Sequence, residues 1–324
     1  MILVIGGAGY IGSHFVEELV ERESVIVLDN LSTGFRRLVN EKAIFIEGDL
    51  ADRDLLHSIF TKYPIAAVVH FAAASLVGES VANPQKYYVN NVGATLQLLQ
   101  VMLENQVDKI VFSSTAATYG IPDGGKITEE AAVRPINPYG RSKRMVELIL
   151  EDYHRSYGMN YVALRYFNAG GAHENGRIGE MHTPETHLIP IVLQHLLGER
   201  ESVSVYGTDY PTRDGTCIRD YVHVTDLAHA HLASLEALLG GTVAAQVFNV
   251  GNGAGFSVGE VIEVCEAITG RKADVKFEER RQGDPAYLVA SNEKIKERLG
   301  WQPTYKLPDM IRTAWKWHTS LADE

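Results

Sequence analysis

The first half of the chain alternates short apolar runs with longer helical patterns, and this alternation leaves few folds open to it. The runs expected to form β-strands are Ile2–Ile5, Val25–Leu28, Ala43–Glu47, Ala67–Phe71, Lys109–Ser113 and Tyr161–Leu164. The helices expected between them are Ile11–Glu21, Arg53–Lys62, Pro84–Asn105 and Pro138–Tyr157. Strands that alternate with helices and are apolar on both faces form a parallel sheet covered on both sides. The sequence therefore predicts a doubly wound α/β domain that binds ligands at the carboxyl ends of its strands.

The composition narrows the class of protein. Of the 324 residues, 45% are hydrophobic and 22% are charged, the balance of an ordinary globular protein. The net charge of −11 disfavours a nucleic-acid partner, which would need a basic surface. Cys217 and Cys265 are too few for a disulfide framework, and we find no targeting segment or membrane-spanning stretch. We therefore expect a cytoplasmic protein that binds neither nucleic acid nor membrane.

A glycine-rich turn joins the first strand to the first helix. Gly6, Gly9 and Gly12 follow Ile2–Ile5 directly, and glycine lets the backbone approach a pyrophosphate at the helix amino terminus. Asp29 ends the next strand, where a carboxylate accepts the ribose hydroxyls of NAD and would repel the 2′-phosphate of NADP. The pattern thus predicts a Rossmann domain that binds NAD.

Two further strand ends lie at the same edge of the predicted sheet. Asp49 follows the third strand, where it can reach the adenine edge or, equally well, cap the helix Arg53–Lys62. Phe71-Ala72-Ala73 ends the fourth strand with small side chains that leave room for the cofactor, although small residues also suit helix packing. Neither observation decides the cofactor by itself.

Tyr139 and Lys143 form a candidate proton-transfer pair. They are four residues apart in the predicted helix and lie on one face of it. The Lys143 charge and the positive nicotinamide ring would lower the pKa of Tyr139 from its usual value of about 10. Thr115, beyond the fifth strand, can align a substrate hydroxyl with Tyr139. The alternative is a surface Tyr–Lys pair beside a threonine turn; together with the NAD site, however, the set predicts redox chemistry at a carbon bearing a hydroxyl group.

The pattern changes after about residue 166. His187–Leu197 and Val224–Leu239 are expected to be helices and Val247–Val250 a strand, separated by polar loops rich in glycine and proline. We expect residues 1–166 to form the NAD-binding domain, to which the chain returns at about 222–250. The remaining segments of 167–324 are expected to form a smaller, mixed α/β lobe that binds the substrate.

Many motifs in this order resemble the extended short-chain dehydrogenase/reductase family, and within it the nucleotide-sugar 4-epimerases, over nearly the whole chain. The motifs are Gly6–Gly12, Asp29-Asn30, His70-Phe71-Ala72, Tyr87–Val92, Ser113–Gly120, Tyr139–Lys143, Arg165–Asn168, Arg219-Asp220-Tyr221 and Arg280-Arg281-Gln282-Gly283-Asp284. The resemblance implies an isomerase of galactose metabolism that interconverts UDP-glucose and UDP-galactose through a transient 4-keto sugar, with tightly bound NAD.

The resemblance also implies roles for individual residues. Tyr139 is the acid/base, Lys143 lowers its pKa and binds the nicotinamide ribose, and Thr115, a serine in some epimerases, helps proton transfer. The cofactor residues are Gly6, Gly9, Tyr10, Ile11, Gly12, Asp29, Asn30, Asp49, Leu50, Phe71, Ala72, Ala73, Asn90, Ser113, Tyr139, Lys143 and Phe167. The UDP-sugar residues are Thr115, Tyr139, Asn168, His187, Leu188, Tyr206, Arg219, Arg281 and Asp284. Ser75 departs from the family, because some members have a lysine there that contacts the cofactor phosphates. A homodimer is implied as well, in which the helices Pro84–Asn105 and Pro138–Tyr157 form a four-helix interface.

Three other functions fit parts of the pattern. A nucleotide-sugar 4,6-dehydratase usually has an Asp-Glu pair after the threonine, whereas Ala116-Ala117 cannot transfer protons. An epimerase of UDP-N-acetylhexosamine or of a UDP-pentose would differ in pocket volume; Pro285–Leu288 is expected in the pocket wall, but no residue is assigned as the limit on sugar size. A non-enzymatic NAD-binding protein would be expected to lack Tyr139, Lys143 or the hydroxyl at position 115.

His182, Glu185 and His187 invite a metal-site interpretation. They lie in a proline-containing loop without the HExxH spacing of a helical zinc site, and the predicted chemistry requires no metal. We therefore expect no metal here and interpret these residues as polar or helix-capping residues of the substrate lobe.

Overall fold

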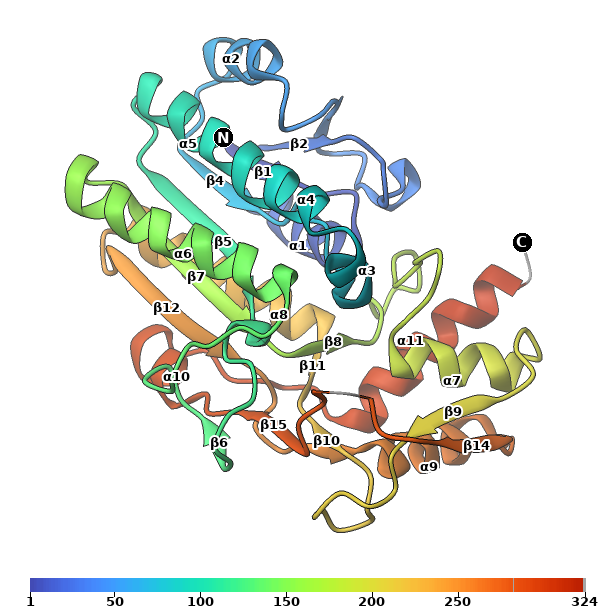
Figure 1. Ribbon diagram of the computed structural model, residues 1–324. Helices are drawn as coiled ribbons and strands as arrows, with labels where there is room; N and C mark the ends of the chain where they lie inside the picture. Colours follow the sequence, from blue (N-terminus) through green and yellow to red (C-terminus); the bar gives the residue numbers. More distant parts are fainter. Residues whose placement is uncertain (282, 323–324) are drawn as a thin grey trace.

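Seven parallel strands form the central sheet of the computed structural model, which describes residues 1–281 and 283–322. Their order across the sheet is β12-β7-β5-β4-β1-β2-β3 (Figure 1). The strands are β1 (Ile2–Ile5), β2 (Val25–Asp29), β3 (Ile44–Glu47), β4 (Ala67–His70), β5 (Lys109–Thr115), β7 (Asn160–Tyr166) and β12 (Ala245–Val250). The predicted doubly wound fold is confirmed, and β12 is the strand expected when the chain returns.

Helices cover both faces of this sheet. The helices are α1 (Tyr10–Leu19) and α8 (Val224–Leu239) on one face, and α2 (Arg53–Lys62), α5 (Ala94–Glu104) and α6 (Pro138–Tyr157) on the other (Figure 1). Alternate residues of each strand serve the two layers: in β1, Val4 packs toward α1 and Leu3 toward α2 and α5. No helix within the described residues combines the length and apolar character that crossing a bilayer requires.

The long helix predicted from Pro84 is not continuous. After α3 (Val77–Ala82), the chain forms α4 (Pro84–Tyr87), widens into the π-helix η2 (Tyr88–Gly93) and continues as α5. The Asn91 side chain in the wide turn accepts a hydrogen bond from Ala74 N at 2.8 Å and donates to Ala74 O at 2.9 Å. It also donates to Ser142 Oγ at 3.0 Å. The widened turn therefore links the loop after β4 to α6, at the edge where ligands are expected.

The smaller lobe is built on a mixed sheet of four short strands in the order β13-β10-β15-β6. These strands are β13 (Phe256–Ser257), β10 (Ile218–Arg219), β15 (Tyr287–Ala290) and β6 (Lys126–Ile127). Two strand pairs flank it: β8 (Asn168–Gly170) with β11 (Tyr221–His223), and β9 (Val203–Tyr206) with β14 (Val275–Glu278). The remaining helices are α7 (Leu188–Leu197), α9 (Val258–Thr269), α10 (Glu293–Leu299) and α11 (Leu307–Ala322) (Figure 1). Of these, α7, α9 and α11 share one apolar core.

One strand of the smaller lobe comes from an unexpected part of the chain. β6 lies between β5 and α6 in sequence, yet it pairs with β15. The chain therefore enters the smaller sheet well before residue 166. The division into domains at that residue stays a prediction.

Candidate active site

The glycine turn lies between β1 and β4, where the strand order of the sheet reverses. Gly6 has a φ of 79° and packs so closely on the loop after β4 that an added Cβ would lie 2.5 Å from Ala72 N. A Cβ on Gly12 would lie 2.2 Å from Gly6 O. At Gly9 the nearest atom to such a Cβ would be Gly6 O, at 3.5 Å. Gly6 and Gly12 thus shape the turn itself, whereas Gly9 leaves space at the start of α1.

The start of α1 is suited to an anion. Gly9 is its cap residue, none of the described side chains caps it, and its first turn carries no acidic residue. Asp29 ends β2 beside this turn and is 9% exposed. Its carboxylate accepts hydrogen bonds from Ala8 N at 2.9 Å and Leu31 N at 2.8 Å, and burial raises its pKa. The glycine turn and the carboxylate therefore stand together, as a dinucleotide site requires.

Asp49 is not a helix cap. The α2 helix is capped by Asp52, whose side chain accepts a hydrogen bond from Leu55 N at 3.0 Å. Asp49 instead accepts hydrogen bonds from Asn30 Nδ2 at 2.7 Å and Ala51 N at 2.8 Å. The capping alternative was therefore wrong, and the Asp49 carboxylate lies beside another predicted cofactor residue.

The other predicted cofactor residues lie near these strand ends but differ in what they contact. Tyr10 is buried, and its hydroxyl donates to Gly171 O at 2.6 Å, which ties α1 to the smaller lobe. Asn90 Nδ2 donates to the neighbouring Asn91 Oδ1 at 2.9 Å. The remaining residues are Ile11 in α1, Leu50 after β3, Phe71, Ala72 and Ala73 after β4, Ser113 in β5 and Phe167 after β7.

Thr115, Tyr139 and Lys143 meet at the carboxyl end of β5. The Thr115 hydroxyl lies beside the Tyr139 phenol. Lys143 Nζ donates to Ser113 O at 2.8 Å. The Tyr87 ring packs edge-on against Tyr139, with 6.4 Å between the ring centres. The structure therefore brings the three predicted catalytic residues together in a buried site.

Burial controls the pKa of both titratable groups. It raises the pKa of Tyr139, and the neighbouring Thr115 hydroxyl only partly opposes this. It lowers the pKa of Lys143 to about 7, opposed by the charge of Glu147. The expected lowering of the Tyr139 pKa is therefore not produced by the protein's own groups, because desolvation outweighs them.

A buried ion pair supports the helix that carries Tyr139. Arg165 on β7 binds Glu147 through Nε–Oε1 at 2.9 Å and Nη2–Oε2 at 2.7 Å, and their side chains are 4% and 1% exposed. Ser114 Oγ also donates to Glu147 Oε1, at 2.6 Å. Glu147 was not predicted as a site residue, although its place one turn after Lys143 on the same helix face was a usable signal.

The predicted substrate residues lie on separate elements of the smaller lobe. Arg219 at the end of β10 forms a short ion pair with Asp284. The Arg281 guanidinium stacks on the Tyr206 ring at 3.9 Å. Gln282, from the same motif, lies outside the described residues. Guanidinium groups in this arrangement suit the oxygens of a diphosphate.

Three other predicted substrate residues lie where a strand or a helix begins. Asn168 begins β8, and its side chain lies beside that of Tyr221. Leu188 begins α7, and His187 precedes it at the cap position. Tyr287, from the expected pocket wall, begins β15 and pairs with Ile218 beside Arg219.

Glu180, His182, Glu185 and His187 converge in the loop before α7. One ligand atom of each lies within 4.8 Å of the others. The Glu185 Oε1 accepts Thr186 N at 2.7 Å and His187 N at 2.9 Å, two groups that precede α7, and no described side chain caps this helix. The His187 side chain makes no capping bond within the described part of the chain and faces Glu180 at short range. Glu180 is a member of this group that was not predicted from the sequence.

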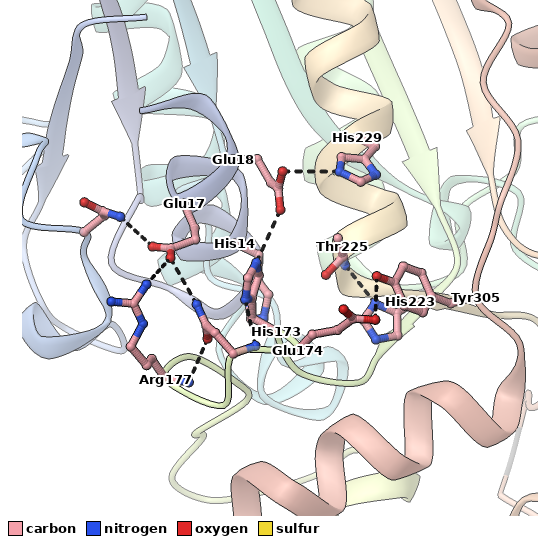
Figure 2. A network of polar contacts seen from close by, with 12 residues as sticks. His14, Glu17, Glu18, His173, Glu174, Arg177, His223, Thr225, His229 and Tyr305 are labelled. Atoms are coloured by element: carbon pink, nitrogen blue, oxygen red, sulfur yellow. Dashed lines mark hydrogen bonds and ion pairs between the residues drawn. The ribbon is translucent and has the colours of Figure 1, made fainter. Parts of the chain in front are cut away.

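A group of polar contacts, here called the polar clasp, joins α1 to the smaller lobe and to α8 (Figure 2). It consists of Glu17, Glu18, His173, Arg177 and His229. Glu18 lies 3.3 Å from His173 and 3.4 Å from His229. Glu17 accepts a hydrogen bond from Arg177 at 2.8 Å. Because these contacts begin one turn beyond the glycine turn, the clasp holds the smaller lobe against the helix that would bind the cofactor.

We expect the clasp to stabilise the fold in a pH-dependent way. Glu18 raises the pKa of His173, so protonated His173 stabilises the folded protein. This contribution is complete below the unfolded-state pKa of 6.5 and is lost as the pH rises through the raised pKa. His173 and His229 lower the pKa of Glu18, so its ionised carboxylate also stabilises the folded protein. This contribution is present above pH 4.5, the unfolded-state pKa, and is lost as the pH falls. Burial lowers the pKa of the neighbouring His14 and His223 to about 3, so they stay neutral in this window.

Glu18→Gln should therefore lower the melting temperature most between pH 4.5 and 6.5 and progressively less at higher pH. Differential scanning fluorimetry across this range measures the difference. Glu23→Gln, an exposed residue just after α1, is the matched control. A difference that does not change with pH would contradict the role of His173.

Comparison with known proteins places the chain in a family. A protein-family model described as GDP-mannose 4,6 dehydratase matches residues 3–314 of the chain. A UDP-glucose 4-epimerase of Halalkalibacterium halodurans is 54% identical over 319 residues, 98% of this chain and 95% of the relative. A crystal structure of a UDP-glucose 4-epimerase is 50% identical with a TM-score of 0.97, covering 99% of this chain and 98% of that one. The UDP-glucose 4-epimerase of Bifidobacterium longum, in complex with NAD+ and UDP, is 39% identical with a TM-score of 0.94 and 99% coverage of both chains. The chain therefore belongs to the NAD-dependent epimerase/dehydratase family of extended short-chain dehydrogenases/reductases.

Proposed function

We propose that the chain is an NAD-dependent UDP-glucose 4-epimerase (EC 5.1.3.2), which interconverts UDP-glucose and UDP-galactose. The observation that carries the proposal is the buried Tyr139 side chain, with the Thr115 hydroxyl beside it and Lys143 one turn along the same helix. It lies at the same edge of the sheet as the glycine turn. Similarity to UDP-glucose 4-epimerases over nearly the full chain supports this proposal.

The residues at the glycine turn fit NAD. The space at Gly9 and the uncapped start of α1 would receive the pyrophosphate, and Asp29 the adenosine ribose. Asp49 would face the adenine and Lys143 the nicotinamide ribose. Bound there, NAD supplies the reversible two-electron oxidation of the sugar's C4 and a positively charged ring. With Ser75 in place of a lysine, the phosphates depend more on the backbone of α1.

Tyr139 would move the proton in both directions of the reaction. Its oxygen takes the proton of the sugar 4-hydroxyl, while Thr115 holds that hydroxyl in line. A protonated Lys143 stabilises the phenolate that accepts the proton. The 4-keto sugar then turns over within the cleft, and Tyr139 returns the proton to O4 on the other face. The sugar is neither oxidised nor reduced overall.

Residues after Thr115 separate this reaction from a dehydration. The family model that matches the chain is described as a dehydratase. Elimination of water requires an additional acid and base beside the sugar. Ala116 and Ala117, which begin the short helix after β5, supply neither. The site therefore favours epimerisation.

The smaller lobe would hold the UDP part and leave the hexose free to turn. Arg219 and Arg281 would bind the diphosphate, and Asp284 would accept ribose hydroxyls. The other proposed contacts are Asn168, His187, Leu188 and Tyr206. Anchoring at the nucleotide alone permits either face of the 4-keto sugar to be presented.

The test is turnover by the purified protein without added reductant. We expect conversion of UDP-glucose and of UDP-galactose to the same equilibrium mixture. UDP-N-acetylgalactosamine and UDP-arabinose are the comparison substrates. Faster turnover of either would replace the proposed sugar, and protein that binds NAD but converts none of them would refute the enzymatic proposal.

Asp29→Ser should weaken NAD binding about 10- to 100-fold and reduce the preference over NADP. The variant loses charge-assisted hydrogen bonds to ribose hydroxyls and the charge that repels a 2′-phosphate. Fluorescence titration with NADH and NADPH measures both effects. Asp54→Ser, an exposed residue on α2, is the control. Tighter binding of NADPH than NADH by the unaltered protein would contradict the role of Asp29.

We further propose a homodimer that uses one apolar face of the NAD-binding domain. A shallow apolar hollow on η2, α5 and α6 is lined by Tyr88, Val89, Val92, Gly93, Leu96 and Met145. Val89 is 63% exposed. Exposed apolar clusters of this kind are typical of protein interfaces. A second copy of the same helices would cover this face in a four-helix arrangement.

Val89→Asp should convert the dimer to a monomer, because it places a charge in the centre of the proposed interface. Light scattering after size-exclusion chromatography gives the mass. Ile121→Asp, at an apolar residue that is 57% exposed outside this face, should leave the mass unchanged. An unaltered protein that is already a monomer would refute the dimer.

The cytoplasmic location stays a prediction. Cys217 and Cys265 are both buried and free. Thiols remain free in a reducing compartment, which supports the prediction. The proposed function requires neither a membrane nor a nucleic acid as partner.

A further inference from the structure

The segment 180–187 forms a compact group of metal-ligating side chains, which we name the 180–187 cluster. Its members are Glu180, His182, Glu185 and His187, and their ligand atoms lie within 4.8 Å of one another. Both carboxylates are buried, whereas the His187 side chain is 55% exposed. The cluster is therefore anchored by its acids and open to solvent through its imidazoles.

The two buried carboxylates require a compensating positive charge. His182 Nδ1 lies 3.0 Å from Glu180 Oε1, and His187 Nδ1 makes a short contact with the same oxygen. Glu185 Oε2 lies 3.8 Å from His182 Nδ1. A ring nitrogen approaches a carboxylate oxygen this closely when it carries a proton, or when a cation joins the two. Two imidazolium protons or one divalent cation would give the same balance of charge.

The donor set fits the divalent cation. The His182 and His187 ring centres are 5.4 Å apart, close enough for both rings to present a nitrogen to one ion. A bound metal ion requires both imidazoles to be neutral. Two imidazole nitrogens and two carboxylate oxygens suit Zn²⁺, whereas Ca²⁺ and Mg²⁺ prefer oxygen ligands alone.

The geometry needs only small movements to complete such a site. In a tetrahedral zinc site with bonds of about 2.1 Å, neighbouring ligand atoms lie about 3.4 Å apart. The ligand atoms of the 180–187 cluster lie within 4.8 Å. Side-chain rotations that shift these atoms by about 1 Å would bring them to bonding distance.

We propose that the 180–187 cluster binds one divalent transition-metal ion, with Zn²⁺ as the best match, in a structural role. Trp317 on α11 donates its ring N–H to Glu180 O at 2.8 Å. Tyr10, the first residue of α1, packs edge-on against His182 with 6.2 Å between ring centres. The ion would thus fix the segment that leads into α7 against both helices. This inference does not depend on the epimerase activity.

Metal binding is tested on the full chain, as purified with its nucleotide and then treated with a chelator. We expect one Co²⁺ per chain, with the visible absorption of a four- or five-coordinate ion, and displacement of that ion by equimolar Zn²⁺. Saturation should raise the melting temperature by an amount on the order of 5 °C. These measurements are independent of turnover, so their failure is distinguishable from failure of the proposed function.

Two variants and a control locate the ion. Glu185→Gln and the double variant His182→Asn/His187→Asn should each weaken Co²⁺ binding about 100-fold or more. His57→Asn removes a partly exposed histidine that lies 2.9 Å from Glu104 on the opposite side of the sheet, and it should bind like the unaltered protein. If one variant does not fold, the other still tests the site. Absence of tight binding by the unaltered protein, or equal binding by the folded variants, would overturn the proposal and leave a proton-sharing cluster.

Discussion

Replacement of Tyr139 by phenylalanine is expected to lower kcat for UDP-galactose about 1,000-fold or more, with UDP affinity changed only a few-fold. The variant loses the oxygen that lies beside the Thr115 hydroxyl and would accept the sugar proton. It keeps the ring that packs against Tyr87, so α6 and the nucleotide wall should remain in place. Steady-state kinetics gives the loss of turnover, and calorimetric titration with UDP gives the affinity.

The control for this variant is Tyr153→Phe, which removes a phenol from the same helix nearly three turns beyond Lys143. It should leave kcat unchanged, because its hydroxyl is not part of the proposed site. Turnover close to normal in Tyr139→Phe would assign the proton transfer to another group. Loss of UDP binding in that variant would show instead that the substitution disturbs the lobe.

The largest loss of stability is expected from Glu147→Gln, at about 3–5 kcal/mol in the free energy of unfolding. The substitution leaves the buried Arg165 guanidinium without its carboxylate and weakens the bond from Ser114. Urea denaturation followed by circular dichroism measures the change. Because Glu147 raises the pKa of Lys143 against burial, the variant should also lose activity at a lower pH as Lys143 deprotonates.

Two comparisons separate the ion pair from a general effect on the helix. Glu151→Gln breaks an exposed pair with Arg155 one turn further along α6 and should cost less than about 1 kcal/mol. The double variant Glu147→Leu/Arg165→Met should recover part of the loss, because it removes both buried charges. A loss below about 1 kcal/mol in Glu147→Gln would contradict this role of the ion pair, because only water could then compensate the buried guanidinium.

The central sheet was predictable because its strands are buried on both faces and read as continuous apolar runs. The helices Arg53–Lys62, Pro138–Tyr157 and Val224–Leu239 have the predicted bounds. The first two follow caps that can be read in the sequence, Asp52 and Asn137. The sheet of the smaller lobe was not predicted, because strands of two residues such as β10 and β13 carry no periodicity.

The candidate site was predictable in its membership but not in its electrostatics. A spacing of four residues places Tyr139 and Lys143 on one face of a helix, whatever surrounds them. It does not reveal that the Lys143 amine binds Ser113 O, or that burial raises the Tyr139 pKa. The ion pair of Arg165 with Glu147 joins a strand to a helix and likewise depends on packing across the sheet.

The pairing of β6 with β15 limits how the two lobes can move. The chain passes from the large sheet into the smaller one at β6, returns for α6 and β7, and passes again through β8 and β11 before α8. In a hinge motion, two rigid bodies move apart because a few connecting residues change their backbone angles. Here the chain passes between the lobes at several separate places, and all of these would have to change together. The cleft is therefore expected to keep a nearly constant width through the catalytic cycle. The inversion at C4 then requires rotation about the bonds of the sugar diphosphate, and the ligand is the flexible partner of the reaction.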